Sequence, residues 1–68
     1  MFDIYKFKYI VSKKGFTLGD VAAWLGINQT TLYRKMYGIS DFTRNEIFII
    51  CNNLNLNNED TFSIFFAT

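Results

Sequence analysis

The stretch from Thr17 to Gly38, TLGDVAAWLGINQTTLYRKMYG, limits the folds open to this chain more than any other segment. Its pattern predicts two short helices joined by a sharp turn at Gly26, where the reversal needs a positive φ that glycine adopts at little cost. Thr17 suits the N-cap of the first helix, and Asn28 suits that of the second. Residues 28–37 are therefore predicted to form a helix that follows directly on its predecessor.

Each of these two predicted helices has one apolar face. We expect the inward residues to be Val21, Ala22, Leu25, Ile27, Leu32 and Met36. Ala22 is small at a position where the neighbouring helix must approach closely. The outward stripe of the second helix is predicted to carry Gln29, Thr30, Tyr33, Arg34 and Tyr37, with Lys35 at its flank.

Local signals predict three further helices. Asp3 suits the N-cap of a first helix, and Thr43 with Glu46 forms a capping box for a fourth. Asn57 or Asn58 suits the cap of a last one. Because the chain has no proline and no long alternating pattern typical of strands, we expect an all-α, compact five-helix domain.

The C-terminal segment is too apolar for a solvated tail. We expect Phe62 and Phe65 to pack inside the domain and Phe66 to remain for a partner, such as a second copy in a weak homodimer. No linker, repeat or change of composition divides the chain. Residues 1–68 are therefore predicted to form a single helix-turn-helix domain.

The single cysteine, Cys51, and the absence of histidine narrow the chemistry. They exclude an internal disulfide and argue against a zinc site, so we expect no metal, no cofactor and a reducing, cytoplasmic setting. Cys51 itself is expected to be a buried, apolar thiol. Without histidine, the six scattered acids form no catalytic constellation, so an enzyme is not expected. No segment approaches the ~20 apolar residues that span a bilayer, so no membrane partner is expected.

Charge is distributed unevenly along the chain. Residues 1–35 carry six basic and two acidic side chains, whereas residues 36–68 carry one basic and four acidic ones. Such a polarity is suited to orienting the domain toward a polyanion. The net charge of +1 is low beside that of strongly basic DNA-binding domains, which argues against the simplest DNA-binding interpretation.

The spacing of small Ala22, turn Gly26, buried Leu32 and Gly38 resembles the helix-turn-helix of the phage Cro and repressor-like (XRE) family. The following stretch, GISDFTRNEIFIICNNLNLNNEDTFSIFF, is similar to small Cro-like or modulator-of-repression proteins of temperate phages that infect Gram-positive bacteria. The resemblance covers almost the whole chain and implies a location in the cytoplasm of a bacterial host cell. The family includes DNA-binding repressors, antitoxins and proteins that antagonise a repressor by binding it.

The resemblance implies a role for each residue of the second helix. Gln29, Thr30 and Arg34 stand where the family reads bases, and their chemistry suits adenine, the thymine methyl group and guanine respectively. The side chains that would contact phosphate or sugar are Thr17, Asn28, Tyr33 and Lys35. For Gln29 and Thr30 the alternative is ordinary helix-start polarity, and for Arg34 and Lys35 it is a solvated face.

Other residues depart from the family pattern. Leu18 stands where many relatives carry a glutamine that clamps a phosphate. Tyr33 and Tyr37 replace small or charged residues, and Trp24 falls at a position that usually faces solvent. Exposed Tyr and Trp are favoured anchors of protein interfaces, so the candidate interface residues are Trp24, Tyr33, Tyr37 and Phe66. For Trp24 the alternative is a ring folded over the edge of the core.

Two functions therefore remain open. The first is a phage-type transcriptional regulator of the lysis/lysogeny switch that binds operator DNA through residues 28–37. The second is a modulator, or antirepressor, that captures the cognate phage repressor and blocks its DNA binding. The first function is favoured by the register of the polar pairs Gln29-Thr30 and Arg34-Lys35. The low net charge and the leucine at position 18 favour the second.

Overall fold

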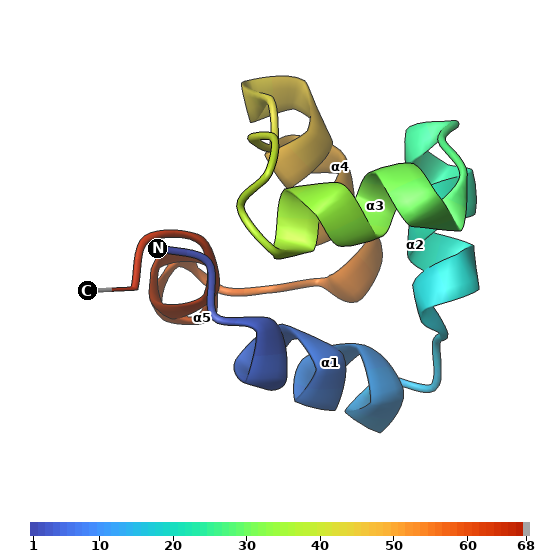
Figure 1. The fold of residues 1–68 in the computed structure, drawn as a ribbon. Coiled ribbons are helices and arrows are strands. Elements are labelled where there is room, and N and C mark those ends of the chain that lie inside the picture. The colour runs from blue at the N-terminus through green and yellow to red at the C-terminus, as the bar shows by residue number, and fades with distance from the viewer. Residues whose placement is uncertain (68) are drawn as a thin grey trace.

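The computed structural model describes residues 1–67, which contain five α-helices and no strand. The helices surround one core, and the N-terminus lies beside α5 (Figure 1). Their bounds are α1 (Ile4–Lys13), α2 (Leu18–Leu25), α3 (Gln29–Met36), α4 (Arg44–Leu54) and α5 (Asn58–Phe65). The prediction of an all-α, five-helix fold is confirmed.

Every helix begins at a side chain whose oxygen accepts a backbone N–H three residues further on. This contact satisfies one of the N–H groups that the first turn leaves without an intrahelical partner. The reciprocal capping box of Thr43 and Glu46 is present, and Thr17 makes a second one with Asp20. The five N-cap residues are Asp3, Thr17, Asn28, Thr43 and Asn57.

The turn between α2 and α3 depends on Gly26, whose φ is +68°. A Cβ added at this position would meet no atom within 4 Å, so the need for glycine comes from the backbone conformation and not from lack of space. Ile27 then packs against the core, half-buried, before Asn28 caps α3. The helix–turn–helix arrangement predicted for this segment is confirmed.

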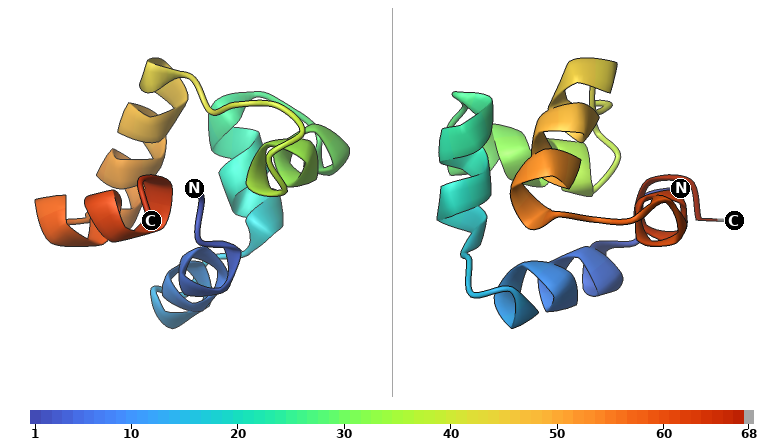
Figure 2. Two further views of the ribbon diagram at one scale, coloured as in Figure 1. Left: turned by 60° about the vertical axis from the view of Figure 1, so that its left-hand side comes forward. Right: turned by 180° about the vertical axis from the view of Figure 1, so that it is seen from behind.

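All five helices contribute to the apolar core. The four expected residues Val21, Ala22, Leu32 and Met36 are buried, while Leu25 and Ile27 lie half-buried at its edge. The view from behind in Figure 2 shows α1 at the lower end of the domain and α4 at the upper end, with α2 on one side and α5 on the other. The buried residues are Phe7, Ile10, Val11, Val21, Ala22, Leu32, Met36, Ile50, Leu54, Ile64 and Phe65.

An aromatic cluster joins the two ends of the chain. The ring of Phe2 lies 5.0 Å from that of Phe42 and 5.3 Å from that of Phe65, between centroids. Asp3 N–H donates to the Ile64 carbonyl at 2.7 Å. Edge-to-face and tilted pairs of this kind add to the stabilisation that burial supplies. The N-terminal residues are therefore part of the fold.

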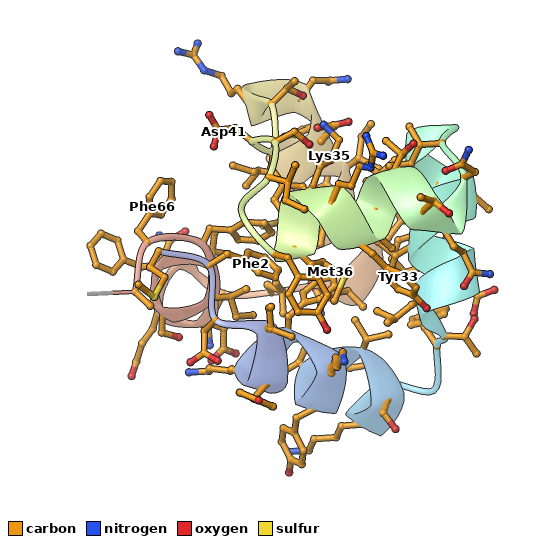
Figure 3. All side chains as sticks on the ribbon, in the orientation of Figure 1. Phe2, Tyr33, Lys35, Met36, Asp41 and Phe66 are labelled. Atoms are coloured by element: carbon orange, nitrogen blue, oxygen red, sulfur yellow. The ribbon has the colours of Figure 1, made fainter. Side chains whose placement is uncertain are left out.

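The expectation that Phe62 packs inside was wrong, because its side chain is 65% exposed. Ile64 and Phe65 both point inward, and since successive helical residues turn by about 100°, Phe62 falls on the outer side of α5. Its ring lies 5.8 Å from that of Phe66, which is also exposed. Figure 3 shows Phe66 at the periphery of the domain.

Cys51 also differs from expectation. Its thiol is half-buried, and Sγ lies 3.3 Å from the Thr61 hydroxyl oxygen, where either atom can be the donor. The thiol therefore links α4 to α5 through a polar contact, because Thr61 faces the same side of α5 as Ile64 and Phe65.

Candidate functional site

The outward face of α3 has the orientation that the sequence predicts. Gln29, Thr30 and Arg34 are exposed, whereas Leu32 and Met36 on the opposite side of the helix are 0% and 1% exposed. α3 crosses the front of the domain in Figure 1. The buried pair fixes the rotation of α3 about its axis, and this rotation presents the three polar side chains to solvent.

Two features make this face suited to a negatively charged partner. First, the Arg34 guanidinium makes no hydrogen bond or ion pair with other side chains of residues 1–67, so its donors are free to bind a partner. The first turn of α3 has no acidic residue, whereas those of α2, α4 and α5 each have at least one. The positive end of the α3 dipole is therefore not offset by a carboxylate of its own first turn.

Gln29 is held against its neighbours. The Tyr33 hydroxyl donates to Gln29 Oε1 at 3.3 Å, and a Cβ added at Gly19 would lie 3.2 Å from Gln29 Nε2. The amide thus rests over the first turn of α2, and a side chain at position 19 would require it to shift slightly. Sequence reasoning missed Gly19, although a glycine inside a predicted helix is a signal of such a close approach.

Asn28 has one role that the structure describes. Its Oδ1 accepts the Thr31 N–H at 2.8 Å and so caps α3. Thr17 likewise accepts the Asp20 N–H at 3.1 Å, and the Asp20 carboxylate accepts the Thr17 N–H at 2.9 Å. An acidic side chain therefore lies beside Thr17, which makes the start of α2 a less favourable place for a phosphate.

Lys35 is engaged within the domain. Its Nζ lies 3.1 Å from Glu46 Oε1 and donates to the Asp41 carbonyl at 3.0 Å. The side chains of Lys35 and Glu46 are only 12% and 15% exposed. Figure 3 shows Lys35 between α3 and α4 and Asp41 on the loop that joins them. Lys35 therefore ties α3 to α4 and to the intervening loop, which leaves its ammonium less available to a phosphate than sequence reasoning expects.

The Glu46 carboxylate is stabilised in its ionised form. Burial raises the pKa of Glu46, but the Thr43 backbone N–H, which donates at 2.8 Å, and the neighbouring Lys35 lower it. The net result is a pKa below the ordinary value of 4.5. The ion pair with Lys35 is consequently intact at neutral pH.

Trp24 and Leu18 belong mainly to the scaffold. Trp24 is half-buried, packs against the core and meets the Phe16 ring edge-on at 5.0 Å between centroids. Leu18 is half-buried against the same core. Of the four candidate interface residues, Trp24 is thus the one whose ring covers the edge of the core.

The structure brings two other candidate interface residues together. Tyr37 and Phe66 both line a groove of about 740 Å³ between the end of α3, the N-terminal residues and the end of α5. Their side chains are 63% and 52% exposed, and Tyr33, which does not line the groove, is 41% exposed. The remaining lining residues are Met1, Phe2, Ile4, Lys35, Met36, Gly38, Ser40, Asp41, Phe42, Ile47 and Phe65.

Comparisons with protein-family models, with curated proteins and with solved structures found no match to this chain. The structure defines the class as a small all-α domain that contains a helix–turn–helix. Among residues 1–67, no helix has the length and apolar content needed to cross a membrane, and no three side chains of the metal-binding types gather at one place.

Proposed function

We propose that this protein is a phage-type transcriptional regulator that binds operator DNA by placing α3 in the major groove. The observation that carries the proposal is the exposed face of α3, where Gln29, Thr30 and Arg34 project from a helix held by buried residues. An eight-residue helix is about 12 Å long, which is also about the width of the major groove.

The three side chains have complementary preferences for bases. Arg34 can donate two hydrogen bonds to guanine, and Gln29 can pair in a bidentate way with adenine. The Thr30 methyl group suits contact with the thymine methyl group. All three stand on one stripe of α3, so a short half-site of a few base pairs matches this face.

Phosphate contacts are the weaker part of this interface. Lys35 is paired with Glu46, and Asp20 lies beside Thr17, so the proposal assigns backbone contacts mainly to the polar side chains of Asn28 and Tyr33. Affinity is then expected to depend on salt less steeply than for strongly basic domains, because the number of released counterions follows the number of charged contacts.

A weak homodimer is part of the proposal. Phe62 and Phe66 form an exposed ring pair, and Phe66 also lines the groove next to Tyr37. A second copy seated on these side chains would remove their rings from water. Symmetric pairing would present two α3 helices to two half-sites of one operator.

Selection from a pool of random duplexes at low salt tests this function with the full chain. We expect one sequence to be enriched, and Arg34→Ala to weaken binding to it by about 1–3 kcal/mol while relaxing one base position. The matched control is Arg44→Ala, which removes an exposed arginine from α4 and leaves α3 intact. Absence of any enriched sequence, or equal losses in both variants, would refute operator binding.

A second function is favoured by a specific observation on the same side of the domain. Tyr33, Tyr37 and Ile39 are 41%, 63% and 74% exposed along the second half of α3 and the residues after it. Aromatic anchors of this kind suit a protein partner, which in this alternative is the cognate phage repressor. The protein would then act by capturing the repressor and blocking its contact with the operator.

The two functions predict opposite responses to the same pair of variants. In repressor capture, Tyr37→Ala weakens the complex at least tenfold and Arg34→Ala has little effect. In operator binding, the order is reversed. Titration of the labelled protein with the cognate phage repressor, and separately with the selected duplex, distinguishes the two functions.

A further inference from the structure

A second exposed face, separate from that of α3, runs along α1. Tyr5 and Tyr9 are 85% and 62% exposed, and Lys8, Ser12 and Lys13 are exposed beside them. These five residues, which we call the basic aromatic face, follow the spacing i, i+3, i+4, i+7 and i+8. This is the spacing of a helix face that packs on another helix, although here its members are lysine, tyrosine and serine.

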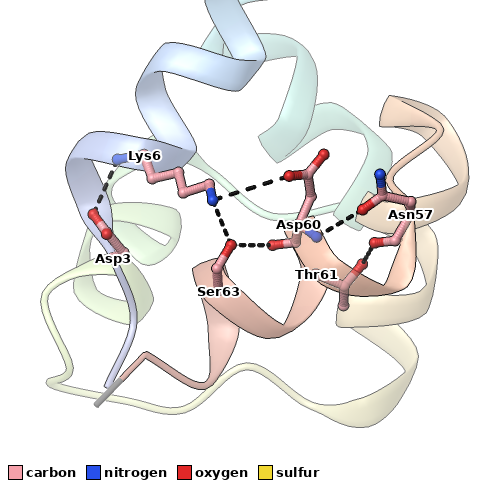
Figure 4. A network of polar contacts seen from close by, with 6 residues as sticks. All are labelled: Asp3, Lys6, Asn57, Asp60, Thr61 and Ser63. Atoms are coloured by element: carbon pink, nitrogen blue, oxygen red, sulfur yellow. Dashed lines mark hydrogen bonds and ion pairs between the residues drawn. The ribbon is translucent and has the colours of Figure 1, made fainter.

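The positive charge of this face is not balanced within the domain. Residues 4–19 contain no acidic side chain. Lys6 Nζ, at the border of the face, lies 3.9 Å from Asp60 Oδ1 and donates to the Ser63 hydroxyl (Figure 4). Lys6 thus uses the nearest carboxylate of α5. Within residues 1–67, neither Lys8 nor Lys13 has an ion-pair partner.

The Tyr9 ring is held where a partner can use it. Lys13 Nζ lies 5.7 Å from the centroid of the Tyr9 ring, so cation and ring form one continuous surface. The Phe7, Ile10 and Val11 side chains on the other side of α1 are buried, which keeps this helix from rotating. Tyrosine offers a large contact area at low entropic cost, and it is enriched at the centre of protein interfaces.

We propose that the basic aromatic face binds an acidic helical segment of another protein. Carboxylates of such a segment would pair with Lys8 and Lys13, and its apolar side chains would pack on Tyr5 and Tyr9. α1 forms the lower end of the domain in every view of Figures 1 and 2, and its buried residues point toward the core above it. The occupant would therefore lie on the side of α1 that faces away from α3.

The observations favour a protein partner over duplex DNA and over a lipid surface. A ten-residue helix spans about 15 Å, along which duplex DNA presents about nine phosphate charges, and the face offers two unpaired lysines. An acidic helix presents one carboxylate per turn on a face and so matches this density. The face has no aliphatic side chain for insertion into a bilayer, which argues against a lipid surface.

Titration of the ¹⁵N-labelled full chain with a helical 18-residue peptide of glutamate, alanine and leucine tests the proposal. The peptide carries its glutamates and leucines on one face. We expect amide shifts confined to residues 4–14 and saturable binding. Lys8→Glu should weaken this binding at least tenfold, whereas Arg44→Glu, which makes the same charge change on exposed α4, should change it less than twofold.

An aromatic pair supplies the second comparison. Tyr9→Ala should weaken peptide binding about fivefold, while Phe48→Ala should leave it unchanged, since Phe48 on α4 is 63% exposed and so closely matches Tyr9. The proposal is overturned if the peptide shifts no residue of α1, or if Lys8→Glu and Arg44→Glu have equal effects. It is also overturned if single-stranded DNA or phosphatidylserine vesicles bind this face more tightly than the peptide does.

Discussion

Lys35 Nζ and Glu46 Oε1 lie 3.1 Å apart across the interface between α3 and α4, in a setting where both side chains are largely shielded from water. Lys35 also donates to the Asp41 carbonyl, so one ammonium joins α3, the following loop and α4. Glu46 in turn caps the first turn of α4. The orientation of α3 therefore depends on this ion pair as well as on the apolar core.

Lys35→Ala is expected to lower the free energy of unfolding by about 1–3 kcal/mol, because it leaves the shielded Glu46 carboxylate without its cation. Urea denaturation measures the change. Lys8→Ala serves as control, since Lys8 is exposed and its loss should stay within about 0.5 kcal/mol. Equal stability of the two variants would show that the ion pair does not hold α3 in place.

Acid is expected to weaken the fold through the same carboxylate. The pKa of Glu46 is lower in the folded state than its ordinary value of 4.5, so the unfolded chain binds more protons between the two values. Stability from Glu46 is therefore present above pH 4.5 and is lost as pH falls through the folded pKa. Urea midpoints measured from pH 3 to 6 should show a smaller decrease for Glu46→Gln than for the unmodified protein. Parallel curves would contradict this assignment.

Two glycines should respond to alanine in opposite ways. Gly26→Ala forces a side chain into a left-handed conformation and is expected to cost about 1–2 kcal/mol. Gly19→Ala lies inside α2 at an ordinary helical φ, so better helix propensity should add about 0.5–1 kcal/mol if the Gln29 amide moves aside. Urea denaturation of both variants checks the signs. Destabilisation by Gly19→Ala would mean that Gln29 is held rigidly.

Gly19→Ala should also act on the proposed operator contact. Displacement of the Gln29 amide is expected to weaken binding of the selected duplex, and in a Gln29→Ala background the same substitution should have no further effect. Fluorescence anisotropy with all four proteins completes the cycle. Additive losses would indicate that Gly19 acts on binding by a route other than Gln29.

Phe66→Ser is expected to shift self-association toward monomer, because Phe66 is exposed and lines the groove that the second copy would cover. Sedimentation at several protein concentrations measures the shift. Phe48→Ser is the control, since it removes an exposed ring on α4 outside the groove. A monomer at every concentration in the unmodified protein would reject the dimer.

The sequence by itself determined where the helices begin. The caps at Asp3, Thr17, Asn28 and Thr43 and the turn at Gly26 all follow the predicted pattern. Each of these features depends on atoms within three or four residues of one another. A short stretch of sequence therefore contains all of the interacting groups.

Only the tertiary structure decided how several exposed or half-buried side chains are used. Lys35 pairs with a residue eleven positions away, Phe62 points outward beside Phe66, and Gln29 rests over Gly19. These outcomes depend on the distance and rotation between helices, which the packing of all five helices sets together. Helical periodicity placed Gln29, Thr30 and Arg34 on one face. Whether the neighbouring Lys35 can contact a partner depends on α4, because Glu46 of that helix pairs with its ammonium.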